Sequence, residues 1–164
     1  MKILGVDPGS STTGYGIVEQ HENQLLHIEN GDIFVSPKTP FPQALKKIYD
    51  GLQGIIICSS PDVVAVEDLF LCKNVKTALK LGHARGIAIL AAVNAGLDVY
   101  EYSPLEIKQA VVGYGRATKE QTQMMVKELL NLHDIASFDA SDALAVAICH
   151  IHSIRMRDIL RQAR

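Results

Sequence analysis

The chain has 164 residues, 48% of them hydrophobic, and a formal net charge of −2 from 16 basic and 18 acidic residues. This size and balance fit one globular domain with a substantial core, and they exclude a uniformly basic protein that binds nucleic acid indiscriminately. No apolar run approaches the ~20 residues that span a bilayer, and the run after Lys2 is too short for a signal peptide, so we expect a cytoplasmic protein without a membrane anchor.

The first predicted element is a buried strand that ends in an aspartate, within the opening MKILGVDPGSSTTGYGIVEQ. Residues 3–6 are apolar and are followed by Pro8, and residues 14–18 are again strand-like, so the two segments form a hairpin around Asp7. A dinucleotide fingerprint needs a glycine loop that opens a helix, and a P-loop ends in Gly-Lys-Ser/Thr; neither fits here. Taken alone, Asp7 could equally be a turn residue that bonds its own backbone.

The later elements alternate between strands and helices. They are a strand over 24–35, a helix that ends at the breaker 59–61, a strand over 62–67, a helix over 74–94, a strand over 98–102, and helices that begin near 104, 119 and 139. Ser103 and Thr118 each begin a capping-box pattern, and the helix after Thr118 is expected to run to about Leu132. This order predicts an α/β fold, with one sheet covered by helices on both faces.

The cysteines and histidines suggest no disulfide or metal site. Cys58, Cys72 and Cys149 are widely spaced and contain no Cys-x-x-Cys pair, which favours reduced core thiols. The close histidine pair, His150 and His152, is two residues apart on a predicted helix, so its members point to different faces.

Four carboxylates stand at the ends of predicted elements. Asp7 and Glu67 each end an apolar strand, while Asp139 and Asp142 are three apart on one helix and share a face. Taken singly, each has an ordinary explanation, such as Asp139 as an N-cap with Asp142 at N3. If the four converge, with no lysine in their immediate sequence neighbourhoods, they repel one another unless they hold cations, and oxygen ligands alone suit Mg²⁺ or Mn²⁺.

Five motifs follow one another in an order and at spacings typical of one family. They are Asp7-Pro-Gly-Ser with Thr13-Gly-Tyr-Gly, Val66-Glu67 with Phe70 and Lys73-Asn74, Ala78-Leu-Lys-Leu-Gly with Ala84-Arg-Gly, Val111-Val-Gly, and Asp139-Ala-x-Asp142-Ala-Leu-Ala. From residue 1 to about 152 the chain therefore resembles the RuvC family of Holliday-junction resolvases. The resemblance implies a ribonuclease-H-like fold with a mixed five-stranded sheet in one nuclease domain over 1–164, and a homodimer. It also implies cleavage of four-way junction DNA in recombination and repair, and coupling to the RuvA and RuvB branch-migration proteins.

The resemblance also implies roles for individual residues. The four carboxylates become a catalytic tetrad that holds two Mg²⁺ ions per subunit, with Mn²⁺ as a substitute, and water attacks the phosphodiester. The residues implied or expected to contact DNA are Phe70, Lys76, Lys108, Arg116 and Lys119. Two divalent ions would reverse the sign of the net charge of −2.

Several of these expectations have alternatives at this stage. Lys76 lies in a stripe with Lys73 and Lys80, yet for any single lysine a solvated helix face is the more ordinary explanation. Phe70 needs either a core pocket or a partner such as an unstacked base. The basic tail, residues 155–164, either contacts DNA or frays.

The helix over 74–94 has apolar residues on more than one side, so one stripe can pack on the sheet and another on a second subunit. The residues concerned are Leu79, Ile87, Leu90 and Val93, beside Ala84, Ala88 and Ala91.

Other activities also fit parts of the sequence. An aspartate with glycines on a hairpin resembles the phosphate loop of the actin and sugar-kinase group, but those enzymes close two lobes over ATP and this chain has length for one. A non-catalytic junction binder, or another ribonuclease-H-like nuclease acting on RNA or DNA structures, would keep the fold. The complete tetrad argues against a non-catalytic binder.

Overall fold

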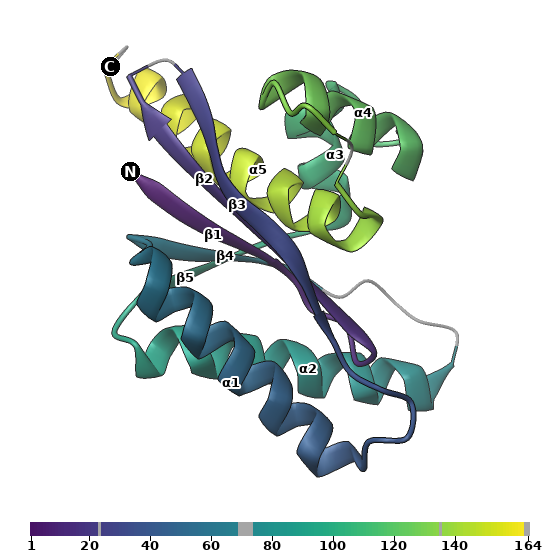
Figure 1. Cartoon of the computed structure of the whole chain (residues 1–164). Helices are drawn as coiled ribbons and strands as arrows, with labels where there is room; N and C mark the ends of the chain where they lie inside the picture. Colours follow the sequence, from purple (N-terminus) through teal and green to yellow (C-terminus); the bar gives the residue numbers. More distant parts are fainter. Residues whose placement is uncertain (23, 69–73, 135, 163–164) are drawn as a thin grey trace.

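The structure is a computed structural model that describes residues 1–22, 24–68, 74–134 and 136–162, with side chains up to Met156. Within these residues, five strands form one sheet in the order β3-β2-β1-β4-β5, and helices cover both of its faces (Figure 1). The elements are β1 (Lys2–Asp7), β2 (Thr12–His21), β3 (Gln24–Phe34), α1 (Phe41–Ser59), β4 (Val63–Glu67), α2 (Val75–Asn94), β5 (Asp98–Tyr102), α3 (Pro104–Val112), α4 (Lys119–Leu129) and α5 (Phe138–Gln162). The predicted mixed five-stranded α/β sheet is confirmed.

The sheet combines an antiparallel half with a parallel half. β1 pairs antiparallel with β2, which pairs antiparallel with β3, so the opening hairpin is confirmed. β1 also pairs in parallel with β4, and β4 with β5. Because β1 and β4 are parallel neighbours, their carboxyl ends lie at the same edge of the sheet.

Helix boundaries follow local capping, with one correction. Ser103 and Thr118 both form the predicted capping boxes at the starts of α3 and α4. The prediction that the latter helix reaches Leu132 is wrong, because α4 ends at Leu129 and Asn131 takes a left-handed backbone with φ of 49°. A non-glycine residue in that region stops helical hydrogen bonding.

The start of α5 also differs from the sequence prediction. Phe138 is its first residue, and the hydroxyl oxygen of Ser137 accepts the backbone N–H of Ala140 at 3.1 Å. Ser137 is therefore the N-cap, and the interpretation of Asp139 as N-cap with Asp142 at N3 is wrong. Both aspartates lie within the first two turns.

Each face of the sheet has its own core. α3, α4 and α5 cover one face, and four apolar residues of α5 are fully buried there: Leu144, Ala147, Ile148 and Ile151. α1 and α2 cover the other face, with the small residues of α2 turned inward: Ala84, Ala88, Ala91 and Ala92. The two helical layers stand on opposite sides of the strands in Figure 1.

Glycines on β1 and β2 let α5 approach the sheet very closely. A Cβ atom at Gly5 would lie 2.0 Å from the carbonyl oxygen of Ala143, and one at Gly14 would lie 2.0 Å from the carbonyl oxygen of Asp139. Any side chain at these positions would meet helix backbone, so glycine is required for this packing. The contact at Gly14 lies at the start of α5, beside the strand end that carries Asp7.

The remaining expectations have mixed outcomes. Cys149 is buried as predicted, whereas Cys58 is exposed on α1, so the prediction of a core thiol is wrong there; Cys72 lies outside the described residues. α5 continues as a helix to Gln162 and so includes most of the basic segment over 155–164. In the described part of the chain, every helix is too short or too polar to span a bilayer.

Candidate active site

Two of the predicted carboxylates meet where neighbouring strands end. Asp7 is the last residue of β1 and Glu67 the last of β4, and the parallel register pairs Val6 with Val66 one residue earlier. The side chains of Asp7 and Glu67 are hydrogen bonded to each other. Ligand sites commonly lie at this carboxyl edge of parallel strands.

The start of α5 brings a third carboxylate to the same place. In the β1–β2 ladder Gly14 pairs with Asp7, and the backbone of Asp139 lies directly over Gly14. Asp142 follows one turn later and lines a cavity together with Asp7 and Glu67. The seating of α5 on the glycines therefore determines where its aspartates lie.

A cavity of about 170 Å³ separates these carboxylates from the α3–α4 layer. Two predicted DNA-binding residues, Lys108 of α3 and Lys119 of α4, also line it, so the structure brings both signs of charge to one site. The complete lining consists of Asp7, Glu67, Pro104, Ile107, Lys108, Lys119, Thr122 and Asp142.

The first pair of carboxylates shares a proton at neutral pH. Burial raises the pKa of Asp7 to about 6, with the charge of Asp142 as the next cause. Burial and then the charge of Asp7 raise the pKa of Glu67 to about 8. The hydrogen bond between them lowers the pKa of Asp7 and raises the pKa of Glu67, so the two carboxyls titrate as a pair that holds one proton between them.

Lys119 neutralises the third carboxylate directly. Its Nζ donates to Oδ2 of Asp142 at 2.8 Å, and this bond is the largest cause of a raised pKa of Lys119. The charges of Asp7 and Glu67 act in the same direction. From the sequence, Lys119 is predicted to contact DNA alone, because the lysine is distant from all four carboxylates in sequence and only the packing of α4 brings it near.

Asp139 lies beside the cavity rather than in its wall. Its side chain is half-buried, and burial is the largest cause of a raised pKa, followed by the charge of Asp32 and, more weakly, that of Asp142. The structure thus places three of the four predicted carboxylates around one cavity and the fourth at the adjacent start of α5.

The carboxylate oxygens are ligands that suit divalent cations. In this structure, however, a proton and the Lys119 ammonium neutralise their charge. Among the described residues, no three carboxylate, imidazole or thiol side chains are gathered tightly enough to chelate an ion. A proton held between Asp7 and Glu67 and the Lys119 ammonium instead offset the repulsion in the site. Burial and then the mutual repulsion of the oxygen donors raise their pKa values, and a divalent cation would relieve that repulsion.

Comparison with known proteins identifies the family. A family model described as Crossover junction endodeoxyribonuclease RuvC matches residues 3–150. The chain belongs to the RuvC family. RuvC of Geobacter sp. (strain M21) is 58% identical over 164 residues, which is 100% of both chains, and RuvC of Citrifermentans bemidjiense is 57% identical over the same length. A structure of T. thermophilus RuvC in complex with Holliday junction substrate has a TM-score of 0.90 at 32% identity and covers 95% of this chain and 96% of that chain. The ribonuclease-H-like fold implied by the resemblance is thereby confirmed.

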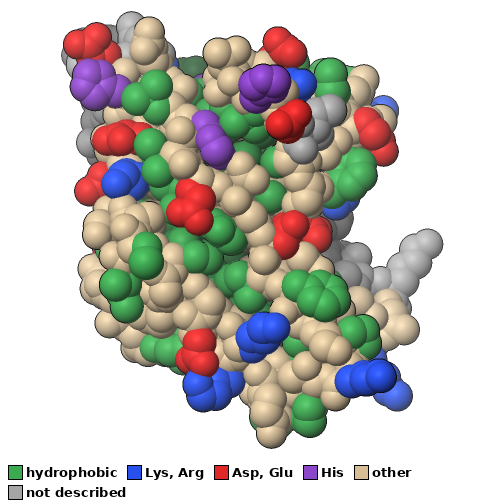
Figure 2. All heavy atoms as spheres, viewed as in Figure 1, with side chains coloured by type: hydrophobic (Ala, Val, Ile, Leu, Met, Phe, Trp, Pro, Cys, Tyr) green, Lys and Arg blue, Asp and Glu red, His purple; other side chains and the backbone are tan. Residues whose placement is uncertain are grey.

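Two further predicted DNA-binding residues of this RuvC-family chain, Lys76 and Arg116, are not part of the cavity lining. Lys76 is exposed in the first turn of α2, and Arg116 is exposed in the loop between α3 and α4. Phe70 and Lys73 lie outside the described residues. Figure 2 shows one face of the molecule, on which most of the visible lysine and arginine side chains lie toward the α1–α2 layer.

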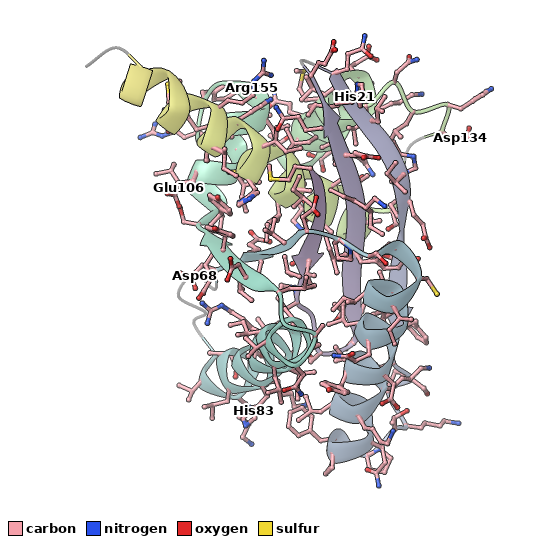
Figure 3. All side chains as sticks on the ribbon, turned by 90° about the vertical axis from the view of Figure 1, so that its left-hand side faces the viewer. His21, Asp68, His83, Glu106, Asp134 and Arg155 are labelled. Atoms are coloured by element: carbon pink, nitrogen blue, oxygen red, sulfur yellow. The ribbon has the colours of Figure 1, made fainter. Side chains whose placement is uncertain are left out.

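The residue after Glu67 belongs to a separate ion-pair network. Asp68 pairs with Arg85 of α2 at 3.1 Å, and the same guanidinium pairs with Glu101 of β5. Figure 3 shows Asp68 near the end of β5, between the α2 and α3 layers. Neighbouring residues at a strand end face opposite ways, so Asp68 points away from the carboxylate site toward Arg85.

Sequence reasoning missed two residues near the site. Thr122 is buried and lines the cavity, and nothing in its local sequence marks it. Ser137 caps α5, and a serine just before Phe138 and Asp139 is an N-cap signal that could have identified it.

Proposed function

We propose that this RuvC-family chain resolves Holliday junctions as a structure-specific endonuclease of the cytoplasm, in DNA recombination and repair. The observation that carries the proposal is the meeting of Asp7, Glu67 and Asp142 with Lys108 and Lys119 around one cavity. T. thermophilus RuvC, whose structure is in complex with Holliday junction substrate, shares nearly the whole fold. The family resemblance further implies coupling to RuvA and RuvB.

Asp7, Glu67, Asp139 and Asp142 would hold two Mg²⁺ ions, with Mn²⁺ as a substitute. The bound ions would supply Lewis-acid stabilisation of the phosphate charge and activation of water. The fit rests on an all-oxygen donor set in which burial and like charges already raise three of the pKa values. Hard divalent cations prefer such ligands.

The chain's own residues prepare this site in two ways. The Asp7–Glu67 pair holds a proton that must be released before both carboxylates can act as cation ligands. Lys119 occupies Asp142, and a competing cation would free its ammonium to face the cavity beside Lys108. The two ammonium groups then bind and orient the DNA phosphate that enters the cavity.

The proposed DNA surface extends beyond the cavity. Lys76 and Arg116 are exposed and free to reach phosphates on either side of it. We propose that Phe70 stacks on a base near the junction crossover, since base–aromatic stacking contributes about 1–3 kcal/mol per base. For Phe70 this rests on the sequence and on the family resemblance.

We also propose a homodimer that forms through α2. Its inner face is made of alanines, while an outer stripe has large apolar side chains that are 47–71% exposed: Val75, Leu79, Leu90 and Val93. Ile87, expected in one of the stripes, packs partly buried against the core. A Cβ atom at Gly86, within the stripe, would have no neighbour within 4 Å, which leaves room for close helix packing. Two subunits related by a two-fold axis would present two identical sites to a two-fold symmetric junction and nick it symmetrically.

Cleavage of a synthetic four-way junction tests the proposed activity. The wild-type protein with Mg²⁺ should nick the junction, leave linear duplex intact and turn over no ATP. Asp7→Asn and Asp142→Asn should bind the junction and lose cleavage by more than tenfold, because each deprives a cation of a ligand while relieving repulsion. Asp98→Asn, at the opposite end of the strands, is the control and should cleave normally. Cleavage by the first two variants within tenfold of wild type would contradict the site.

Sedimentation tests the dimer independently. Leu79→Glu with Leu90→Glu should convert a dimer at micromolar concentration into a monomer, because charges in an apolar interface are desolvated without partners. Ile57→Glu, which changes a side chain 73% exposed on α1, should leave the dimer intact. A wild-type protein that sediments as a fully active monomer would refute the proposal.

A further inference from the structure

The two residues before α5 are held by side chains from two other elements. The hydroxyl of Ser137 donates to Oδ1 of Asp32 at 2.9 Å while it accepts the N–H of Ala140 at 3.1 Å. Nε2 of Gln123, on α4, donates to the carbonyl oxygen of Ala136 at 2.8 Å. We call Asp32, Gln123 and Ser137 the α5 clamp.

The clamp lies immediately beside the proposed catalytic carboxylates. Gly14 pairs with Asp32 of β3 on one side and with Asp7 of β1 on the other. The backbone of Asp139 lies over Gly14, and Ser137 is two residues earlier. The first turn of α5 thus lies across three strands, with Asp32 holding one side of it and Asp7 facing the other.

Helix capping alone does not require the bond to Asp32. An N-cap serine needs only to accept a backbone N–H, and its hydroxyl hydrogen can point to water. Asp32 also adds a negative charge near Asp139, where it increases repulsion in the site and would repel DNA phosphates. The presence of a carboxylate at position 32 is therefore better explained by its hydrogen bond to Ser137 than by its charge.

We propose that Asp32 and Gln123 are positioning residues, which hold the N-terminus of α5 against β3 and α4 so that Asp139 and Asp142 stay in register with Asp7. This inference rests on the proposed roles of the two α5 aspartates. A loosened first turn would misplace the reacting geometry, and a misplacement of about 1 Å can slow a reaction ~100-fold. Junction affinity comes mainly from phosphate contacts elsewhere and should change little.

The first test uses Asp32→Ala and Asp32→Asn in the full-length protein. D32A should quicken amide hydrogen exchange at Ala140 and Ser141 at least fivefold, slow single-turnover junction nicking about tenfold, and leave the junction Kd within twofold. D32N keeps an oxygen that accepts from Ser137 and should behave as wild type in all three. Gln123→Leu should resemble D32A. Asp98→Ala removes an exposed carboxylate at the other end of the strands and is the control.

The second test separates the clamp from simple capping. Ser137→Asp keeps a capping oxygen but loses the donor and faces Asp32 with a like charge, so S137D should be as slow as D32A. The double variant S137D/D32N should recover the nicking rate of wild type, because the amide introduced at position 32 can donate to the carboxylate introduced at position 137. The total charge is unchanged.

The outcomes separate the clamp from the proposed site. The proposal is overturned if D32A exchanges and nicks within twofold of wild type, if S137D alone is as fast as wild type, or if exchange quickens while nicking does not slow. Should Asp142→Asn cleave normally, the proposed site itself fails, and the exchange data alone then decide whether the clamp holds α5.

Discussion

Replacing Gly14 by alanine would show whether the close packing of α5 on the sheet determines the positions of the active-site aspartates. The added Cβ atom would lie 2.0 Å from the carbonyl oxygen of Asp139, 2.3 Å from its carbonyl carbon and 3.0 Å from the backbone nitrogen of Ala140. All three are backbone atoms of one helical turn, so no side-chain rotation can relieve the overlap. The turn itself must move.

The size of this movement sets the expected effect. Cβ atoms essentially never come closer than 3.0 Å to such atoms, so the start of α5 must lift from the sheet by about 1 Å. Overpacking of this kind typically lowers the free energy of unfolding by about 1–3 kcal/mol, which a domain of this size tolerates. The same 1 Å shift moves Asp139 and Asp142 relative to Asp7, and we expect single-turnover nicking to fall ~100-fold.

The assay compares Gly14→Ala with a glycine that has free space. A Cβ at Gly54, on the exposed side of α1, has no neighbour within 4 Å, so Gly54→Ala should cleave normally and gain up to about 1 kcal/mol from helix propensity. Urea unfolding and circular dichroism establish that G14A is folded. A folded G14A that nicks junctions within fivefold of wild type would refute the idea that the glycine seat positions the aspartates.

Three further predictions concern charge. The folded-state pKa of Glu67 is about 8, against an ordinary 4.5. The stability that its protonated form contributes is therefore complete below pH 4.5 and is lost as pH rises toward 8. In EDTA, E67Q should gain stability over wild type across that interval, as measured by urea unfolding, and a constant difference would contradict the raised pKa. K119Q should lower the melting temperature without divalent ions by about 2–4 °C at pH 8, and saturating Mg²⁺ should abolish the difference, because the ion replaces the lost ammonium. R85M should lose about 1–2 kcal/mol of unfolding free energy, since the Arg85 guanidinium of the wild type pairs with the half-exposed Asp68 and Glu101. R85K should recover less than half of this loss. An unchanged urea midpoint for R85M would show that the network is not stabilising.

Local sequence was sufficient for most elements because their signals are short-range. The capping boxes at Ser103 and Thr118 and the strand ends at Asp7 and Glu67 each depend on residues within a few positions. The errors also arose locally. The left-handed turn at Asn131 ended α4 early, and Ser137, rather than Asp139, capped α5.

The sequence motifs predicted the family, and the order of the strands and helices predicted the sheet. The family match over residues 3–150 and the fold likeness to T. thermophilus RuvC bear out both. The carboxylate residue types and their places at element ends pointed to one site before any contact was known. The metal-binding and DNA-binding roles of individual residues remain proposals.

Tertiary structure decided what the carboxylates contact. The sequence alone shows no lysine beside them, yet the packing of α4 places Lys119 on Asp142, and the sheet order places Asp32 next to Gly14. These contacts join residues that are distant in sequence, so no local pattern encodes them. The contact between Lys119 and Asp142 also depends on how closely α5 rests on the glycines of β1 and β2, and that distance is fixed only when the helix packs on the formed sheet.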